Sequence, residues 1–144
     1  VRQPDAVRIT SAALEAIRDH ASEGFPLEIC GMLLAGKGSR EVIGTRRATN
    51  AATERPEVRY KIAPKEHRQI EDEADARGME IVGYYHSHPN HAAYASRFDT
   101  VDAWPNAFYV IASCIERDVK EVEVFQKPGW AADEMIEEPM QVVG

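Results

Sequence analysis

Two histidines and one aspartate are the residues whose types and spacing could do chemistry in this sequence. His86 and His88 lie two residues apart at the end of an apolar and aromatic run. Because residues i and i+2 of a strand point to the same face, both imidazoles can converge on one ion. Asp99 falls in the first turn of an expected helix, from which its carboxylate can reach the same point. Two histidines and a carboxylate leave one coordination position for water, which is typical of a catalytic zinc site.

Each half of this arrangement also has an ordinary structural interpretation. A His-x-His pair is commonly two partly exposed histidines, and Ser96 followed by Asp99 forms a helix-capping box. Pro89 is expected to end the strand and turn the chain. The combination of strand, loop and helix at this spacing is far more specific than either half, so the sequence favours a metal site.

Hydrophobic periodicity, caps and turn residues predict the elements that must position these residues. Strands are expected at residues 7–9, 30–35, 41–49, 58–62, 79–86, 108–114 and 119–125. Helices are expected at residues 10–21 and 64–77, and from residue 97 to just before Pro105. We therefore expect an α/β (α+β) fold, with a mixed central β-sheet flanked by about three helices. Residues 1–144 should form one domain, with its core at about 7–127 and an acidic segment at 128–144.

Composition narrows the class of protein. The chain has 144 residues, 44% of them hydrophobic, and a net charge of −7. An acidic protein is a poor partner for nucleic acid, and no apolar run approaches the length of a membrane span. No secretory leader opens the sequence, and Cys30 and Cys114 are too few for a disulfide framework, so we expect a reducing cytoplasm. The acidic end should be a solvated edge strand or a frayed terminus.

The segment around the two histidines resembles the signature of the JAMM (MPN-plus) zinc metallopeptidase family. That signature is His-x-His-Pro, six residues, and then Ser-x-x-Asp. This chain matches it with His86, His88, Pro89, Ser96 and Asp99. Many relatives have proline before the signature serine where this chain has alanine, a change that removes no ligand. The resemblance implies a JAMM/MPN-like domain with the layering of cytidine deaminases.

Features outside the signature extend the resemblance. The family places a glutamate just before a buried strand, and Glu28 precedes the apolar run at 30–35. Asn50-Ala51, Arg59-Tyr60 and Trp104-Pro105 also resemble the short bacterial members. The similarity therefore spans about residues 7 to 127.

The resemblance implies a role for each matched residue. His86, His88 and Asp99 would hold one Zn²⁺ per chain, and Glu28 would take the proton of the attacking water. Ser96 would donate a hydrogen bond to the developing oxyanion. The implied reaction is hydrolysis of a peptide or isopeptide bond without a covalent intermediate. The short bacterial members resemble enzymes that act on ubiquitin-like sulfur-carrier proteins of the ThiS and MoaD type, cleaving after the C-terminal Gly-Gly.

Three other functions were weighed. The run from His86 to His91 resembles the metallo-β-lactamase motif, but Asn90 replaces its key aspartate. A two-His-one-carboxylate iron oxygenase is a second metal alternative, which the expected helices and Pro89 disfavour. A catalytically silent MPN-type interaction module is the non-enzyme alternative, although silent members lose the ligands that this chain keeps. A homodimer is possible.

The remaining polar residues were given ordinary roles. His20 and His67 should be plain surface residues on helices, and His91 a solvated loop histidine. Ser87 should point away from its histidine neighbours, and the two cysteines should be small buried thiols.

Overall fold

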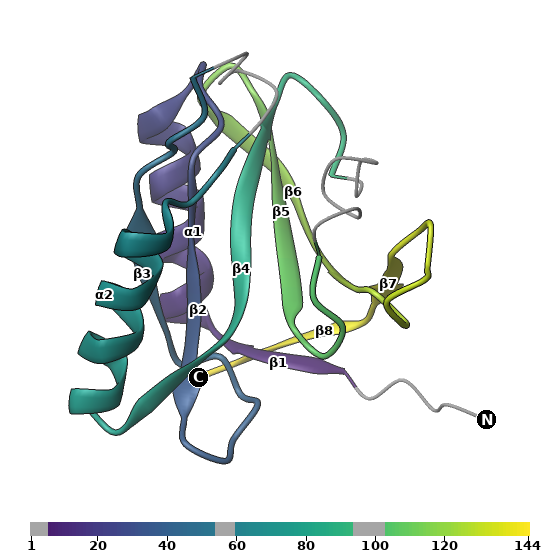
Figure 1. The fold of residues 1–144 in the computed structure, drawn as a ribbon. Helices are drawn as coiled ribbons and strands as arrows, with labels where there is room; N and C mark the ends of the chain where they lie inside the picture. Colours follow the sequence, from purple (N-terminus) through teal and green to yellow (C-terminus); the bar gives the residue numbers. More distant parts are fainter. Residues whose placement is uncertain (1–5, 54–59, 94–102) are drawn as a thin grey trace.

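The computed structural model describes residues 6–53, 60–93 and 103–144 as one sheet-centred chain (Figure 1). The described residues form eight strands and two helices. In chain order they are β1 (Val7–Thr10), α1 (Ser11–Gly24), β2 (Cys30–Gly36), β3 (Gly44–Ala48), α2 (Pro64–Ala76), β4 (Met79–Pro89), β5 (Phe108–Ile115), β6 (Asp118–Gln126), β7 (Ile136–Glu138) and β8 (Met140–Val143).

The main sheet has six strands in the order β3-β2-β4-β5-β6-β7. The β4–β5 pair is parallel and its other pairs are antiparallel, so the prediction of a mixed sheet is confirmed. Gly83 of β4 faces the backbone of Phe108, whose carbonyl oxygen would lie 2.2 Å from a Cβ at this position. A glycine is therefore required where these two strands meet.

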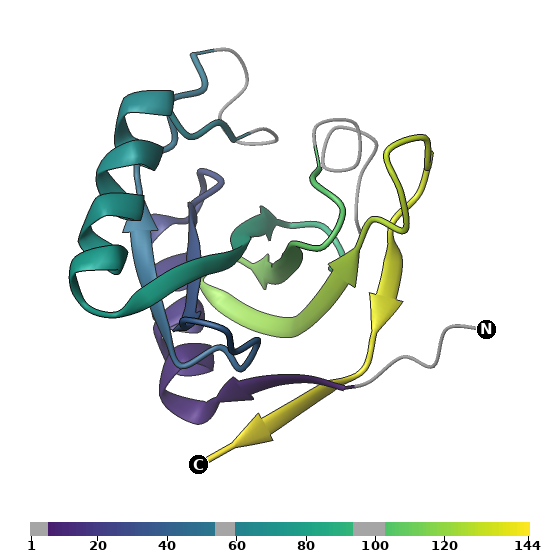
Figure 2. The ribbon, with the colours of Figure 1, turned by 60° about the horizontal axis from the view of Figure 1, so that its bottom comes forward.

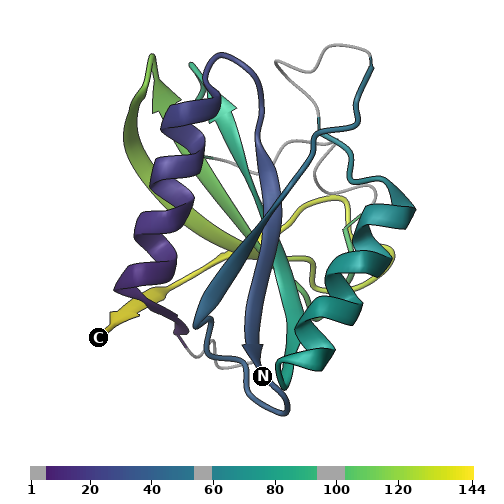
Figure 3. The same ribbon diagram turned by 90° about the vertical axis from the view of Figure 1, so that its left-hand side faces the viewer.

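The two helices cover opposite faces of the sheet, as Figure 3 shows from the side. Neighbouring residues of β4 illustrate this, because successive strand side chains point to opposite faces. Tyr85 contacts His20 of α1, whereas Tyr84 contacts His67 of α2. The result is three layers, with α1, the sheet and α2 stacked in that order.

A separate apolar cluster lies on the sheet face opposite α1. Tyr84 packs against it from β4, so it shares the face toward which the even-numbered residues of β4 point. Its buried members are Ala93, Ala103, Tyr109, Ile111 and Phe125. Ala93 and Ala103 belong to the connection between β4 and β5. Both described ends of that connection therefore pack on the face that also carries His86 and His88.

The two ends of the described chain meet in a second, two-stranded sheet (Figure 2). β1 and β8 are parallel, with Val7 opposite Met140. β7 forms one edge of the main sheet, as expected for the acidic segment. Glu138, however, is only 3% exposed, so this part of the segment is not solvated. None of the described helices is long and apolar enough to cross a membrane.

Several predicted boundaries were wrong. The strand expected at 41–49 is reduced to β3, because Val42 instead forms an isolated bridge to Ile9. Residues 60–62 of the strand expected at 58–62 are irregular, and the rest of it lies outside the described residues, as does the helix expected from residue 97. β4 continues to Pro89, since the β2 ladder already ends at Cys30 opposite His86. A residue without an amide proton therefore costs no hydrogen bond to β2 there.

Candidate metal centre

Glu28, His86 and His88 meet at the upper end of β4 in Figure 1. One potential ligand atom from each lies within 4.8 Å of the others. All three side chains are buried, and His86 is 0% exposed. His86 Nδ1 is 3.3 Å from Glu28 Oε1. The structure thus brings together three of the five residues that the sequence predicted for the site.

Strand pairing explains why Glu28 reaches this position. Cys30 lies opposite His86 in the antiparallel β2–β4 pair. Hydrogen bonds continue beyond the end of β2, because the Ser87 amide donates to the Ile29 carbonyl at 3.1 Å and the Ile29 amide donates to Ser87 Oγ at 3.0 Å. Glu28 follows the same alternation and joins the face of the two histidines. Ser87 points to the other face, as expected from the sequence.

Hydrogen bonds to the histidines determine which ring nitrogens carry protons. His88 Nδ1 lies 3.1 Å from the Ala92 carbonyl, which can only accept, so Nδ1 donates and Nε2 keeps its lone pair. His86 Nδ1 faces two acceptors, Glu28 Oε1 at 3.3 Å and the Ser87 carbonyl at 3.4 Å. It should therefore also carry the proton. Two lone-pair nitrogens beside a buried carboxylate match the ligand chemistry of zinc, with the outer hydrogen bonds that zinc-binding histidines usually make.

Two residues that the sequence did not assign a role support this centre. Tyr60 stacks on His86, with ring centroids 4.5 Å apart and 25° between the planes. Asn50 Nδ2 donates to the Glu28 carbonyl at 2.9 Å. Asn50 Oδ1 accepts from the amides of Ala52 at 3.0 Å and Lys61 at 3.1 Å. Their presence in the stretches that resemble bacterial family members was the only sequence signal for either.

The chain that follows β4 is fixed to the β5–β6 hairpin. Asn90 has a positive φ of 59°, and its amide donates to the Cys114 carbonyl at 2.5 Å. The carbonyl of the exposed His91 accepts from Ser113 Oγ, and the Ala93 amide donates to Glu121 Oε1 at 2.9 Å.

The remaining two predicted site residues belong to the same connection. Ser96 and Asp99 lie outside the described residues. Their assigned roles therefore stay predictions.

Cys30 lies beside the centre but is a poor metal ligand. Burial, followed by the charges of Glu66 and Glu28, raises the pKa of its thiol to about 12. Cys114 is also buried, which raises its thiol pKa. Both remain protonated thiols near neutral pH, whereas a metal ligand must be a thiolate.

The prediction that His20 and His67 are plain surface residues was wrong. His20 is 9% exposed and Tyr85 donates to its Nδ1 at 2.7 Å. Burial, then the nearby Arg47 charge, lowers the pKa of His20 to about 4, against a weaker opposing effect of Glu23. His67 is half-buried and contacts Glu71 Oε1 and the Tyr84 hydroxyl, each at 2.7 Å. Both histidines lie on helix faces that turn toward the sheet, which sequence spacing did not resolve.

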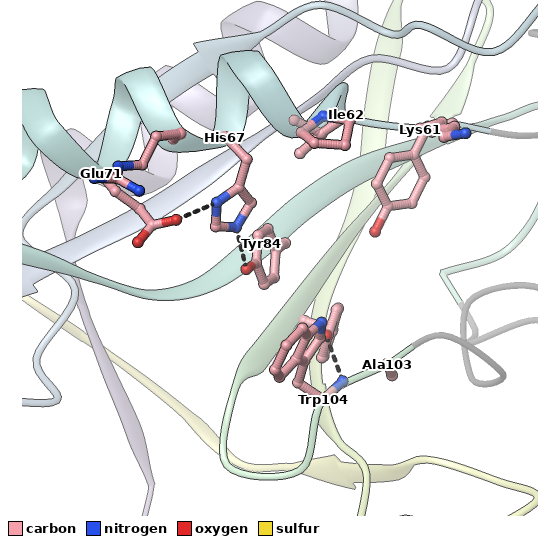
Figure 4. Close-up of a pocket in the computed structure, with 11 residues that line it drawn as sticks. Lys61, Ile62, His67, Glu71, Tyr84, Ala103 and Trp104 are labelled. Carbon is pink, nitrogen blue, oxygen red and sulfur yellow. Dashed lines mark hydrogen bonds and ion pairs between the residues drawn. The ribbon is translucent and has the colours of Figure 1, made fainter.

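A cavity of about 610 Å³ adjoins the centre (Figure 4). It lies between α2 and the residues that precede β5. Tyr60, Ile62, Tyr84, Trp104 and Tyr109 supply most of its apolar wall. Tyr60 therefore contacts both the cavity and His86.

Comparison with known proteins identifies the family. The sequence matches the family of prokaryotic homologs of the JAB domain over residues 10–127. The chain belongs to this family. The expected membership of the JAMM/MPN proteins is thereby confirmed. A desampylase from Haloferax volcanii is 34% identical to this JAB-domain protein over 110 residues, which cover 73% of this chain and 78% of the desampylase.

Solved structures of similar proteins agree with the fold. A protein from Salinibacter ruber is 30% identical, with a TM-score of 0.73 and coverage of 94% of this chain and 91% of its own. A protein from Desulfitobacterium hafniense is 22% identical, with a TM-score of 0.75 and coverage of 94% and 92%. A JAB1/MPN domain protein from Archaeoglobus fulgidus is 16% identical, with a TM-score of 0.59 and coverage of 96% and 99%. The last two similarities support the fold alone.

Proposed function

We propose that this JAB-domain protein is a zinc-dependent isopeptidase that hydrolyses a peptide or isopeptide bond after the C-terminal Gly-Gly of a ubiquitin-like sulfur-carrier protein of the ThiS or MoaD type. The observation that carries the proposal is the convergence of Glu28, His86 and His88 within 4.8 Å. That convergence occurs in a chain 34% identical to a desampylase.

The ligands in this proposal are His86, His88 and Asp99. Zinc bound by them would lower the pKa of a bound water toward ~7 and polarise the scissile carbonyl. The Ala92 carbonyl holds the His88 ring in the orientation and tautomer that a metal ligand needs. Glu28 lies beside His86 rather than behind it, so its carboxylate can act on a water at the same point.

Glu28 and Ser96 carry the remaining steps. The Glu28 carboxylate accepts a proton from the attacking water and later gives it to the leaving amine. Burial of Glu28 excludes competing solvent from this proton transfer. Ser96 donates a hydrogen bond to the oxyanion as the carbonyl carbon becomes tetrahedral.

The choice of substrate rests on the relative and on the chemistry of glycine. The name desampylase describes the removal of a small ubiquitin-like archaeal modifier from another protein. Two glycines at the end of such a modifier let the scissile peptide approach a buried centre without side-chain clashes. The rest of the tail can bind in an extended conformation.

Glu28→Gln tests the proton-transfer role. The variant should keep about one zinc per chain but lose roughly 10²–10⁴-fold in kcat, because an amide cannot accept the proton. Zinc content would be measured by plasma mass spectrometry, and kcat on a purified carrier whose Gly-Gly end is joined to a lysine amine. Glu41→Gln is the control, since Glu41 is a surface carboxylate paired with Arg8. Turnover of Glu28→Gln at the parent rate would show that Glu28 is not the base.

Metal analysis of the parent protein and Asp99→Ala separates the alternatives. About one zinc per parent chain, lost in the variant, is the expected result. Iron with iron-dependent oxygen uptake would instead favour the oxygenase, and failure to bind zinc would favour the silent interaction module. Zinc-loaded protein that leaves the carrier conjugate intact would refute the proposed substrate.

The proposed cellular setting is the cytoplasm. Cys30 and Cys114 are both free and buried, as expected of thiols in a reducing compartment.

A further inference from the structure

The cavity between α2 and Trp104 is built from aromatic side chains around a satisfied polar edge. Tyr60, Tyr84, Trp104 and Tyr109 form its walls, with Ile62 at one side (Figure 4). The Tyr84 hydroxyl is hydrogen-bonded to His67, which also contacts Glu71. The Tyr109 hydroxyl accepts from the Trp104 amide at 2.8 Å. The polar tips of two walls are thus already bonded within the protein, which leaves their ring faces for an apolar occupant.

The cavity is continuous with the candidate metal centre. Tyr60 lines the cavity and stacks on His86. Tyr84 lines it from β4, two residues before His86 and on the same face. Two strand residues span about 6.6 Å, so the cavity begins two to three extended residues from the metal ligands.

Exposed tryptophans continue the apolar surface away from the centre. Trp104 is 59% exposed although it forms a cavity wall. Trp130 is 70% exposed and lies edge-on to Trp104, with ring centroids 5.8 Å apart. Two adjacent indoles with this exposure are unusual on a small protein surface unless a partner covers them.

We propose that this cavity is a substrate subsite that receives an apolar side chain from the third or fourth residue before the scissile bond, next to the Gly-Gly pair. The proposal rests on the proposed function, because that function places a glycine pair at the metal centre. Glycines occupy the first two positions and need no pocket. The first side chain that can enter is therefore the one whose distance from the scissile bond matches the start of the cavity.

Occupancy by an apolar side chain follows from the wall chemistry. A leucine side chain in an aromatic pocket gains about 1.5–3 kcal/mol over an exposed position, or roughly 10- to 100-fold in affinity. The charged lining residues Lys61, Arg68 and Glu71 are exposed. They can remain hydrated when the cavity is filled.

The test uses two peptides that end in Leu-Leu-Gly-Gly or Ser-Ser-Gly-Gly and are otherwise identical. Both resemble the released product, so neither is consumed. The chain has two tryptophans, and therefore two indole N–H signals in a ¹⁵N-correlated NMR spectrum. The Leu-Leu peptide should shift the Trp104 signal with a Kd at least tenfold lower than that of the Ser-Ser peptide. Equal affinities would overturn the proposal.

Three variants locate the binding. Trp104→Ala removes a wall at an exposed position, so it should preserve the fold and raise the Kd of the Leu-Leu peptide at least fivefold. Ile62→Glu should do the same by placing a charge in the cavity. Trp130→Ala is the matched control, because it removes an equally exposed indole that does not line the cavity, and it should change the Kd less than twofold. Equal losses from both tryptophan variants would overturn the subsite in favour of a flat contact surface.

Cleavage assays keep the two proposals distinguishable. Selective binding of the Leu-Leu peptide without cleavage of any carrier conjugate would support the subsite and refute the isopeptidase. Cleavage of leucine- and serine-containing carrier tails with the same kcat/KM would support the isopeptidase and refute the subsite.

Discussion

Replacing Asn50 by aspartate tests how the backbone of Glu28 is held. The Asn50 side chain makes three hydrogen bonds, one as a donor to the Glu28 carbonyl and two as an acceptor from the amides of Ala52 and Lys61. Asn50→Asp keeps the shape and both acceptor bonds. It removes only the donor, and it places a carboxylate oxygen 2.9 Å from the Glu28 carbonyl oxygen. The change therefore acts on Glu28 and leaves the segment that carries Tyr60 attached.

The expected size of the effect follows from that geometry. Loss of a net hydrogen bond costs about 1 kcal/mol, and an acceptor left facing another acceptor adds about as much. We therefore expect the free energy of unfolding to fall by about 2 kcal/mol, which lowers Tm by roughly 6 °C for a domain of this size. Displacement of the Glu28 carboxylate should lower kcat about 10- to 100-fold. KM should stay within twofold, since the Ala52 and Lys61 bonds persist.

Thermal unfolding, zinc content and steady-state kinetics would be measured on the same preparations. Asn106→Asp is the control, because it makes the same chemical change at an exposed turn residue whose positive φ of 75° aspartate tolerates. Parent-like Tm and kcat in Asn50→Asp would refute the reasoning. A fall in kcat accompanied by an equal loss of zinc would also refute it, since the variant should act through Glu28 rather than through the ligands.

Three further predictions concern stability. The depressed pKa of His20 means that the unfolded chain binds a proton that the native one does not, so acidification from pH 8 to 5 should cost about 2 kcal/mol through this residue; chemical denaturation of His20→Gln should lack that component. Gly83→Ala should lower Tm by more than 10 °C because its Cβ would overlap the Phe108 carbonyl, whereas Gly36→Ala, which has open space, should change Tm little. Zinc chelation should lower the Tm of the parent protein, and His88→Ala should be insensitive to the chelator, as calorimetry with and without chelator would show.

The convergence of the two histidines could be predicted because it depends on local geometry alone. A two-residue spacing on a strand places both rings on one face whatever surrounds them. The position of Glu28 could not be predicted in this way. Its approach depends on the register of β2 against β4 and on the Ser87–Ile29 hydrogen bonds, which join residues 58 positions apart. The family resemblance, rather than spacing, identified this glutamate.

The supporting residues were missed for a related reason. Asn50 and Tyr60 lie in irregular chain, where no periodicity indicates direction, and their partners are distant in sequence. The prediction for His20 failed because a polar residue on an amphipathic helix was assigned to solvent. The buried hydroxyl of Tyr85 instead provides its partner across the sheet. Such pairings are set by tertiary packing and leave no local pattern.

The division between β4 and the segments around it bears on how proteins of this kind can diversify. His86 and His88 are part of a central strand with a neighbour on each side, so substitutions that move them disturb the whole sheet. The cavity walls Tyr60, Ile62 and Trp104 belong to connecting chain, two of them preceding α2 and one preceding β5. Mutations there can accumulate with little cost to folding. A lineage could therefore exchange the partner it recognises many times while inheriting the same reaction unchanged.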